Sequence, residues 1–229
     1  MCTMSFRSKR YRAMRDKIDK NKAYTLLEAI TLIKSQSKAR FDESLELHIK
    51  LGVDSKKSEQ TVKGVFMLPH GTGKSVRIAV FTETQQKEAT SAGADIVGGK
   101  DLVDELIAGK KINFDATIAT PDFMKELTRA AKILGTRGLM PSPKAGTVAQ
   151  EVKPIIEKLK RGQVQYRNDS TGNIHQIIGK VSSKEDTLEE NARAFIQEIR
   201  KQKPKGVKGI YLQRITLCST MGPSMSITA

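Results

Sequence analysis

Apolar and polar positions alternate over residues 38–54, KARFDESLELHIKLGVD. The odd positions are Phe41, Glu43, Leu45, Leu47, Ile49, Leu51 and Val53, and the even positions are Asp42, Ser44, Glu46, His48, Lys50 and Gly52. A period of two predicts a β-strand that turns one face to the core and the other to water or a partner. The even positions include a hydroxyl, a carboxylate, an imidazole and an ammonium group, so this face is either an ordinary solvated surface or a binding surface.

Patterns on both sides of this strand predict a helix and a second strand. Thr25 and Glu28 have the spacing of a capping box, and the apolar residues after them recur with a helical period. A helix is therefore predicted over 25–36. A further strand is predicted over 60–68, where Pro69 interrupts the pattern.

From residue 76 onward, short apolar strands alternate with helices. Strands are predicted over 76–81, 94–98 and 115–120, and helices over 84–91 and 101–108. Thr120 is expected to cap a further helix, with Pro121 at its first position. This alternation is typical of a parallel sheet that is covered by helices on both faces.

Glycine and proline interrupt the pattern over residues 133–148, ILGTRGLMPSPKAGTV, which predicts a stiff loop. A helix rich in Lys and Glu follows and ends near Gly162. Because Pro154 is tolerated only near a helix start, this helix begins at either Thr147 or Lys153.

The last part of the chain predicts a hairpin, a helix and a strand. VQYR and NIHQII flank NDSTG (168–172), an arrangement typical of a β-hairpin. Ser183 and Asp186 have capping-box spacing at the start of a helix that ends near Lys201. The last strand is predicted over 210–218, and STMGPS (219–224) is expected to close the ordered chain.

Charge separates the middle of the chain from its ends. The 229 residues carry a formal net charge of +15, and basic residues exceed acidic ones by 7 in residues 1–68, by 2 in 69–159 and by 6 in 160–229. Such an excess points to a polyanionic partner such as nucleic acid. We therefore predict one discontinuous α+β domain from residues 1–68 and 160–229, with an α/β domain inserted at 69–159.

Residues 1–22 hold eight basic and two acidic residues without an apolar helical stripe. They predict a basic arm that either orders on a phosphate backbone or remains a solvated tail. Cys2 and Cys218 are too few and too isolated for a disulfide framework or a metal site, which suits a reducing compartment. No apolar run has the length of a membrane span, so a soluble intracellular protein is expected.

HGTGKS at 70–75 is similar to part of a phosphate-binding loop, but Leu68 stands where that motif requires glycine. Lys74 and Ser75 also lead into a predicted strand, whereas phosphate capture needs a helix N-terminus there. We interpret the segment as a hinge between domains. No GxGxxG follows the predicted strands, so no dinucleotide site is predicted.

ILGTRGLMPSPKAGTV resembles the signature of the bacterial-type large-subunit ribosomal protein L-one family. RFDESLELHIKLGVDSKKSEQTVKG, LPHGTGK, QYRNDSTGNIH and TLCSTMGPS extend the resemblance over nearly the whole chain. The resemblance implies an RNA-binding domain made from both chain ends, with a Rossmann-like three-layer α/β domain inserted between them. It also implies a place on the mobile stalk of the large ribosomal subunit, beside the tRNA exit site.

The resemblance assigns the RNA-binding residues to three segments. These are Lys38, Phe41, Ser44, Glu46 and Lys50 in 38–54, Arg167, Asp169 and Thr171 at the turn, and Thr216, Ser219, Thr220, Met221 and Gly222 near the C-terminus. Short hydroxyl side chains and exposed amides suit recognition of RNA through its shape, phosphates and 2′-hydroxyls. From the residues alone, STMGPS is equally an ordinary turn, Glu46 and Lys50 a surface pair, and His48 and His175 satisfied polar residues.

The expected function is therefore binding of large-subunit rRNA at the stalk, with release of deacylated tRNA from the exit site and repression through the chain's own mRNA leader. No catalytic residue, cofactor or metal is predicted, and the expected location is the cytoplasmic or an organellar ribosome. One alternative is a nucleotide- or phosphate-binding α/β enzyme that uses GTGKS and the middle domain. A second alternative is generic polyanion binding through the basic arm.

Overall fold

The computed structural model describes residues 8–19, 22–55, 57–83, 85–109, 112–143, 146–204, 206–207 and 209–228. The chain divides into two compact units, Met1–Lys74 with Tyr166–Ala229, and Ser75–Gln165. The sequence placed these divisions after residues 68 and 159, and in the structure both lie six residues further along the chain. None of the described helices is both long and apolar enough to cross a lipid bilayer.

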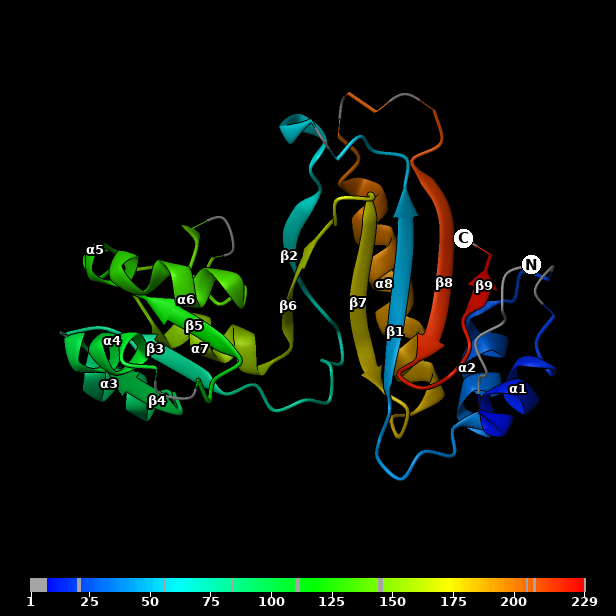
Figure 1. Ribbon diagram of the computed structural model, residues 1–229, viewed down its shortest axis with the longest axis horizontal. Coiled ribbons are helices and arrows are strands. Elements are labelled where there is room, and N and C mark those ends of the chain that lie inside the picture. Colours follow the sequence, from blue (N-terminus) through cyan, green and yellow to red (C-terminus); the bar gives the residue numbers. More distant parts are fainter. Residues whose placement is uncertain are drawn as a thin grey trace. The chain divides into compact units, whose positions relative to one another are not determined.

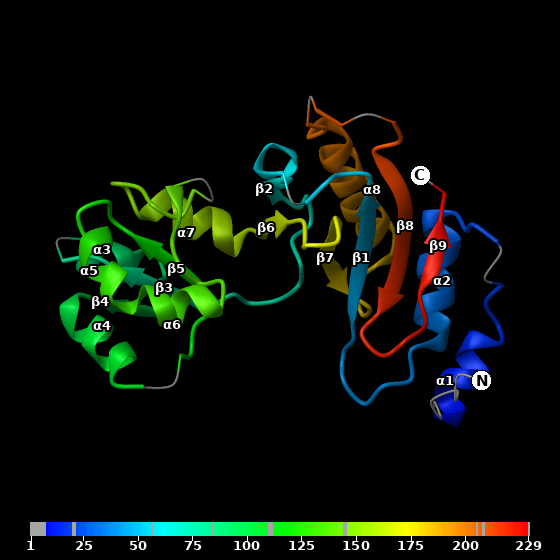
Figure 2. The same ribbon diagram turned by 45° about the horizontal axis from the view of Figure 1, so that its top comes forward.

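An antiparallel sheet of four strands forms the centre of the first unit (Figure 1). Its order is β7 (Asn173–Lys180), β1 (Ser44–Leu51), β8 (Leu212–Ser219) and β9 (Met225–Ile227). Helices α2 (Leu26–Gln36) and α8 (Glu185–Lys201) pack on each other and cover one face of this sheet (Figures 1 and 2). The opposite face carries the exposed and half-buried side chains of β7, β1 and β8.

Strand β1 has the alternation that the sequence predicts. Its apolar positions, which are Leu45, Leu47, Ile49 and Leu51, are each at most 1% exposed, whereas its polar positions are half-buried. Burying one such aliphatic side chain contributes roughly 1.5–3 kcal/mol to stability, so these residues fix which face meets the helices. The strand is shorter than the predicted 38–54, because only Ser44–Leu51 pairs with neighbouring strands.

The two covering helices begin differently. Helix α2 has the predicted capping box, in which the Glu28 N–H donates to Thr25 Oγ1 at 3.3 Å and the Thr25 N–H donates to Glu28 Oε2 at 3.1 Å. Helix α8 ends at Lys201 as predicted, but its predicted capping box is wrong. Lys184 is the N-cap, and Ser183 lies outside the helix in a turn where its N–H donates to the Lys180 carbonyl at 3.0 Å.

The predicted hairpin around residues 168–172 is also wrong. Strand β6 (Gln163–Arg167) pairs with β2 (Lys63–Met67) in a separate two-stranded sheet, while β7 pairs with β1. Asn168 holds the departure point, because its N–H donates to the Val62 carbonyl at 2.9 Å and its Oδ1 accepts from the Val62 N–H at 2.8 Å. The turn therefore links two sheets.

The second unit contains a parallel sheet of three strands in the order β4 (Ile96–Gly98), β3 (Ile78–Phe81) and β5 (Ala116–Ala119). Every residue of β3 is buried, because helices cover both faces of this sheet. Helices α3 (Gln86–Ser91) and α7 (Lys153–Lys160) contribute to one apolar cluster, and α4 (Lys100–Ile107) contributes to the other. The chain is thus a combination of α+β and α/β structure, as predicted.

One predicted helix of the second unit is interrupted, and another begins at one of its two predicted starts. The helix expected after Thr120 consists of α5 (Met124–Leu127), a 3-10 turn η2 (Thr128–Ala130) and α6 (Ala131–Thr136). Thr120 does not cap it, because residues 121–123 form a turn in which the Phe123 N–H donates to the Thr120 carbonyl at 3.1 Å. Of the two starts considered for α7, Lys153 is observed, with Pro154 in the first turn.

Three described elements of the first unit, α1, η1 and β9, were not predicted. Helix α1 (Lys9–Arg15) lies within the expected basic arm, and Met14 and the nearby Ile18 are buried. The arm is therefore structured over residues 8–19, while 1–7, 20 and 21 lie outside the described residues. Strand β9 follows STMGPS and completes the four-stranded sheet, and a short 3-10 turn, η1 (Ser58–Gln60), follows β1.

Candidate nucleic-acid interface

Side chains from three strands stand in cross-strand rows on the sheet face opposite α2 and α8, which we call the open face. Because side chains alternate along each strand, the polar positions of β1 meet those of both neighbours. The rows are Ile177, Glu46 and Cys218; His175, His48 and Thr216; and Asn173, Lys50 and Arg214.

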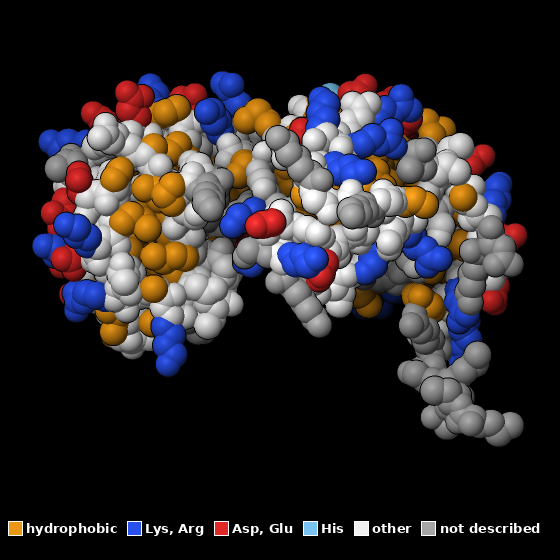
Figure 3. All heavy atoms as spheres, turned by 90° about the horizontal axis from the view of Figure 1, so that it is seen from above, with side chains coloured by type: hydrophobic (Ala, Val, Ile, Leu, Met, Phe, Trp, Pro, Cys, Tyr) orange, Lys and Arg blue, Asp and Glu red, His pale blue; other side chains and the backbone are white. Residues whose placement is uncertain are grey.

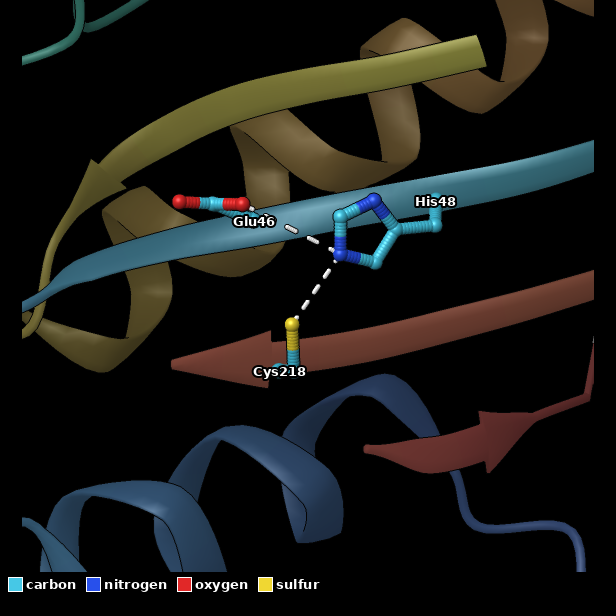
Figure 4. Close-up of side chains that lie close together, drawn as sticks. All are labelled: Glu46, His48 and Cys218. Carbon is cyan, nitrogen blue, oxygen red and sulfur yellow. Dashed lines mark hydrogen bonds and ion pairs between the residues drawn. The ribbon is translucent and has the colours of Figure 1, made fainter. Parts of the chain in front are cut away.

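His48 is the centre of the open face. Its Nδ1 lies 2.8 Å from Nδ1 of His175, and its Nε2 lies 3.0 Å from Sγ of Cys218 and 3.9 Å from a carboxylate oxygen of Glu46 (Figure 4). Burial and the neighbouring His175 lower the pKa of His48, and Glu46 opposes this only in part. Burial and Glu46 raise the pKa of Cys218 to about 11. At neutral pH the cluster therefore holds a neutral imidazole and a protonated thiol.

The turn after β6 borders the open face and is held by one carboxylate. Asp169 Oδ1 accepts from the Asn173 N–H at 2.7 Å and the Thr171 N–H at 2.9 Å, and the Thr171 hydroxyl lies 2.8 Å from both carboxylate oxygens. These bonds, led by that from Asn173, hold the pKa of Asp169 well below its ordinary value. Lys50 also donates to the Thr171 carbonyl. The turn is thus tied to β1 and presents a fixed shape.

A second fixed segment, residues 219–224, lies at the other end of the open face. The Ser44 N–H donates to Thr220 Oγ1 at 3.0 Å, and the Thr220 N–H donates to the Ser44 carbonyl at 3.1 Å. Met221 projects from this segment with 49% of its side chain exposed. A soft apolar side chain held on a rigid turn suits packing against a ribose or a base.

Glu43, which directly precedes β1, anchors this segment through hydrogen bonds. Its carboxylate is 3% exposed and accepts from Ser37 Oγ at 3.0 Å and from the Met221 N–H at 3.2 Å, and Ser219 supplies a further hydrogen bond. Burial opposes ionisation of Glu43, but these hydrogen bonds outweigh it and lower the pKa. Glu43 therefore remains a carboxylate that pins the backbone of 219–222.

Gly222 has an internal role in the same segment. A Cβ at this position would lie 2.5 Å from Ser219 Oγ, which is closer than real side-chain atoms approach. Any larger residue at 222 must therefore displace Ser219 and, with it, a hydrogen bond to Glu43.

Cationic groups surround the open face. Lys180 Nζ donates to Ser44 Oγ at 3.1 Å and to the Asp42 carbonyl at 3.2 Å, and the side chains of Lys38, Arg167 and Arg214 are exposed. A cavity of about 240 Å³ lies between α1 and the last two strands, with Arg15 and Arg214 among its lining residues. Lys and Arg side chains also gather at the end of the unit where η1 and the loop after α8 lie (Figure 3).

The structure brings most of the predicted site residues together. Ser44, Glu46, Lys50 and Thr216 lie on the open face, and the segments at 169–171 and 219–222 border it. Lys38 and Phe41 precede β1 and are exposed, with Phe41 54% exposed, and Arg167 belongs to β6. Ser219 is buried, with its hydroxyl directed to Glu43.

Sequence reasoning overlooked several members of this surface. Arg214 and Cys218 stand at alternate positions of β8 with Thr216, so the same period of two would have indicated them. His48 was recognised on the polar face of its strand but was not assigned a role. The buried position of Glu43 follows from its odd place in the alternation, but its bond to Met221, 178 residues away, has no local signal.

The backbone of the HGTGKS segment (70–75) is held by a side chain of α8. Asn191 on α8 accepts from the His70 N–H at 3.0 Å and donates to the Gly71 carbonyl at 2.9 Å. The segment continues into β3 rather than into a helix, so it lacks the helix N-terminus that binds phosphate in nucleotide-binding loops.

Comparison with known proteins agrees with these features. The model of the Ribosomal protein L1p/L10e family matches residues 33–223. The chain is 47% identical to the large ribosomal subunit protein uL1 of Kosmotoga olearia, over 98% of this chain and 97% of that protein. It is 48% identical to the protein of that name from Coxiella burnetii (strain Dugway 5J108-111), over 96% and 95% of the two chains, and 44% identical to that of Fervidobacterium nodosum, over 96% and 94%.

These matches span both units of the chain, including β1, the 219–222 segment and the glycine-rich loop after α6. With a family model that covers most of its length and relatives of nearly equal length, the chain belongs to the ribosomal protein L1p/L10e family.

Proposed function

We propose that this chain is a non-catalytic constituent of the large ribosomal subunit that binds structured rRNA of the stalk through the open face. The main support for the proposal is the sheet face that α2 and α8 leave uncovered. This face is bordered by two rigid turns and surrounded by Lys and Arg side chains. Its relatives are named large ribosomal subunit proteins, which supports the ribosome as the site of action.

The chemistry of the open face fits folded RNA better than a single strand. Structured RNA is recognised through its shape, its phosphates and its 2′-hydroxyls, whereas single strands are bound by stacking on aromatic side chains. The carboxylate of Glu46 suits a 2′-hydroxyl or an exocyclic amine, and Lys50 and Arg214 suit phosphates. Phe41 is the exposed aromatic side chain among the proposed contacts, so a stacking platform is not formed.

Two finer roles belong to the same proposal and rest on the family resemblance. Residues 69–159 would reach toward exit-site tRNA and assist its release, and the open face would repress translation by binding an RNA fold in the chain's own mRNA. The first role would use the inserted residues, and the second would use the open face of the first unit.

Crosslinking in cells, followed by sequencing of the bound RNA, tests the proposal. Stalk rRNA should dominate the recovered RNA, with the mRNA leader present if repression operates. Recovery of RNA without sequence enrichment would instead favour generic polyanion binding. Micromolar binding of ATP, GTP or NAD in a calorimetric titration would favour the enzyme alternative.

A further inference from the structure

We propose that Glu46, His48 and Cys218 form a binding site for a divalent transition metal ion of the Zn²⁺ class on the open face. The three side chains come from β1 and β8, at adjacent cross-strand positions (Figure 4). A thiolate, an imidazole and a carboxylate are the three ligand types that Zn²⁺ uses in proteins. Glu46 is also a proposed RNA contact, whereas His48 and Cys218 are not, and metal binding can be tested without RNA.

The distances fit one ion. The carboxylate oxygen, the imidazole nitrogen and the thiol sulfur all lie within 4.8 Å of one another. Tetrahedral Zn²⁺, with bonds of about 2.0 Å to nitrogen and about 2.3 Å to sulfur, separates those two ligands by about 3.5 Å. His48 Nε2 lies 3.0 Å from Cys218 Sγ and 3.9 Å from a Glu46 oxygen, so small side-chain rotations suffice.

A second set of groups orients the imidazole. Asp169 lies 3.6 Å from Nε2 of His175, which favours a proton on that nitrogen and leaves Nδ1 of His175 as an acceptor. Nδ1 of His48 then carries the proton in its 2.8 Å contact with His175, and its Nε2 directs a lone pair toward Cys218 and Glu46. Protein metal sites commonly hold a ligating histidine in this way, through its other ring nitrogen.

The charge and proton balance of binding is simple. The Cys218 thiol loses one proton to solvent and a sulfur–metal bond forms, while neutral His48 and ionised Glu46 donate lone pairs without releasing protons. The two anionic ligands neutralise the dication, and water fills the remaining coordination position. Because the thiol must give up its proton, apparent affinity should rise about tenfold per pH unit above neutrality.

Titration with Co²⁺ under reducing, anaerobic conditions tests the site on the full chain. Wild-type protein should develop a thiolate-to-cobalt charge-transfer band that saturates at one equivalent and is abolished by Zn²⁺. Cys218→Ser should lose this band, whereas Cys2→Ser should keep it. His48→Gln and Glu46→Gln should weaken binding by about tenfold or more, whereas His70→Gln, which changes a histidine outside the cluster, should leave it unchanged.

Absence of the band in the full chain would overturn the proposal, as would its persistence in Cys218→Ser. Unchanged affinity in both His48→Gln and Glu46→Gln would do the same, because it would reduce the site to a lone thiol. X-ray absorption of the Zn²⁺-loaded wild-type chain needs no variant. It should show one sulfur at about 2.3 Å with nitrogen and oxygen neighbours at about 2.0–2.2 Å, and a shell without sulfur would contradict the site.

Discussion

Glu43 connects the stability of the fold to the shape of the proposed interface. Its buried carboxylate accepts from Ser37, Ser219 and the Met221 N–H, and an amide at this position would leave at least one of these donors without an acceptor. Glu43→Gln should therefore lower the free energy of unfolding at pH 7 by about 1–3 kcal/mol. Urea unfolding measures this change, with exposed Glu59→Gln as the matched control.

The loss of unfolding free energy in Glu43→Gln should depend on pH. The folded pKa of Glu43 lies below its ordinary value, so its contribution is present above the unfolded pKa of about 4.3 and is lost as pH falls through the folded pKa. The difference in unfolding free energy between wild type and Glu43→Gln should shrink as pH falls below about 4. A difference that stays constant down to acid pH would show that the carboxylate charge contributes nothing.

Met221 tests specificity at a single exposed side chain. Because the 219–222 backbone is pinned by Glu43 and Ser44, Met221→Ala should leave the fold intact and remove only the projecting thioether. It should weaken binding to stalk rRNA by roughly 1.5–3 kcal/mol, the range for burying a Met side chain, and leave binding to a random duplex unchanged. Filter binding with both RNAs measures the contrast, and equal losses would place Met221 outside the interface.

Among the elements, β1 shows what the sequence could predict and why. Alternation, capping-box spacing and apolar runs are all local properties. The buried face of β1, the capping box of α2 and the buried strand β3 were therefore readable from their own residues. The hairpin was not, because the partner of β6 is β2, about 100 residues earlier in the chain. Strand β9 has only three residues and depends on pairing with β8, and α1 is stabilised by the burial of Met14 rather than by a full apolar stripe.

Some parts of the candidate site were likewise predictable from local patterns, and other parts were not. The period of two in β1 was sufficient to place Ser44, Glu46 and Lys50 on one face. The contact between His48 and His175 and that between Glu43 and Met221 depend on strand register and tertiary packing, which no local pattern contains. The capping box at Ser183 failed because the spacing of a motif does not fix the residue at which a helix begins.

The two faces of the four-stranded sheet should respond differently to the same kind of truncation. Leu47 is fully buried against the helices, so Leu47→Ala should cost about 2–5 kcal/mol of stability. Ile177 is 39% exposed on the open face, and Ile177→Ala should cost less than about 1 kcal/mol. Urea unfolding of both variants checks the prediction, and a reversed order would mean that the open face is the packed one.

At the scale of the whole molecule, the two units should be separable in function. The proposed RNA contacts all lie in Met1–Lys74 and Tyr166–Ala229, and residues 69–159 carry a net charge of only +2. Replacing residues 75–161 with a flexible Gly/Ser linker keeps β6 and its partner β2. Once circular dichroism confirms that this variant folds, its affinity for stalk rRNA should lie within about tenfold, or 1.4 kcal/mol, of the full chain.

Ribosomes that carry this shortened chain should nevertheless release exit-site tRNA abnormally, since the missing unit is the one proposed to reach the tRNA. A thousandfold loss of rRNA affinity in the folded variant would place essential RNA contacts on the second unit.

The most direct test of the open face is to map which residues touch the RNA. The full chain is bound to a stalk rRNA fragment, crosslinked with ultraviolet light, digested and examined by mass spectrometry for peptides that carry nucleotides. Crosslinks should fall on residues 38–50, 167–175 and 212–222. Crosslinks confined to residues 78–160, or to the solvent-facing surfaces of α2 and α8, would contradict RNA binding by the open face.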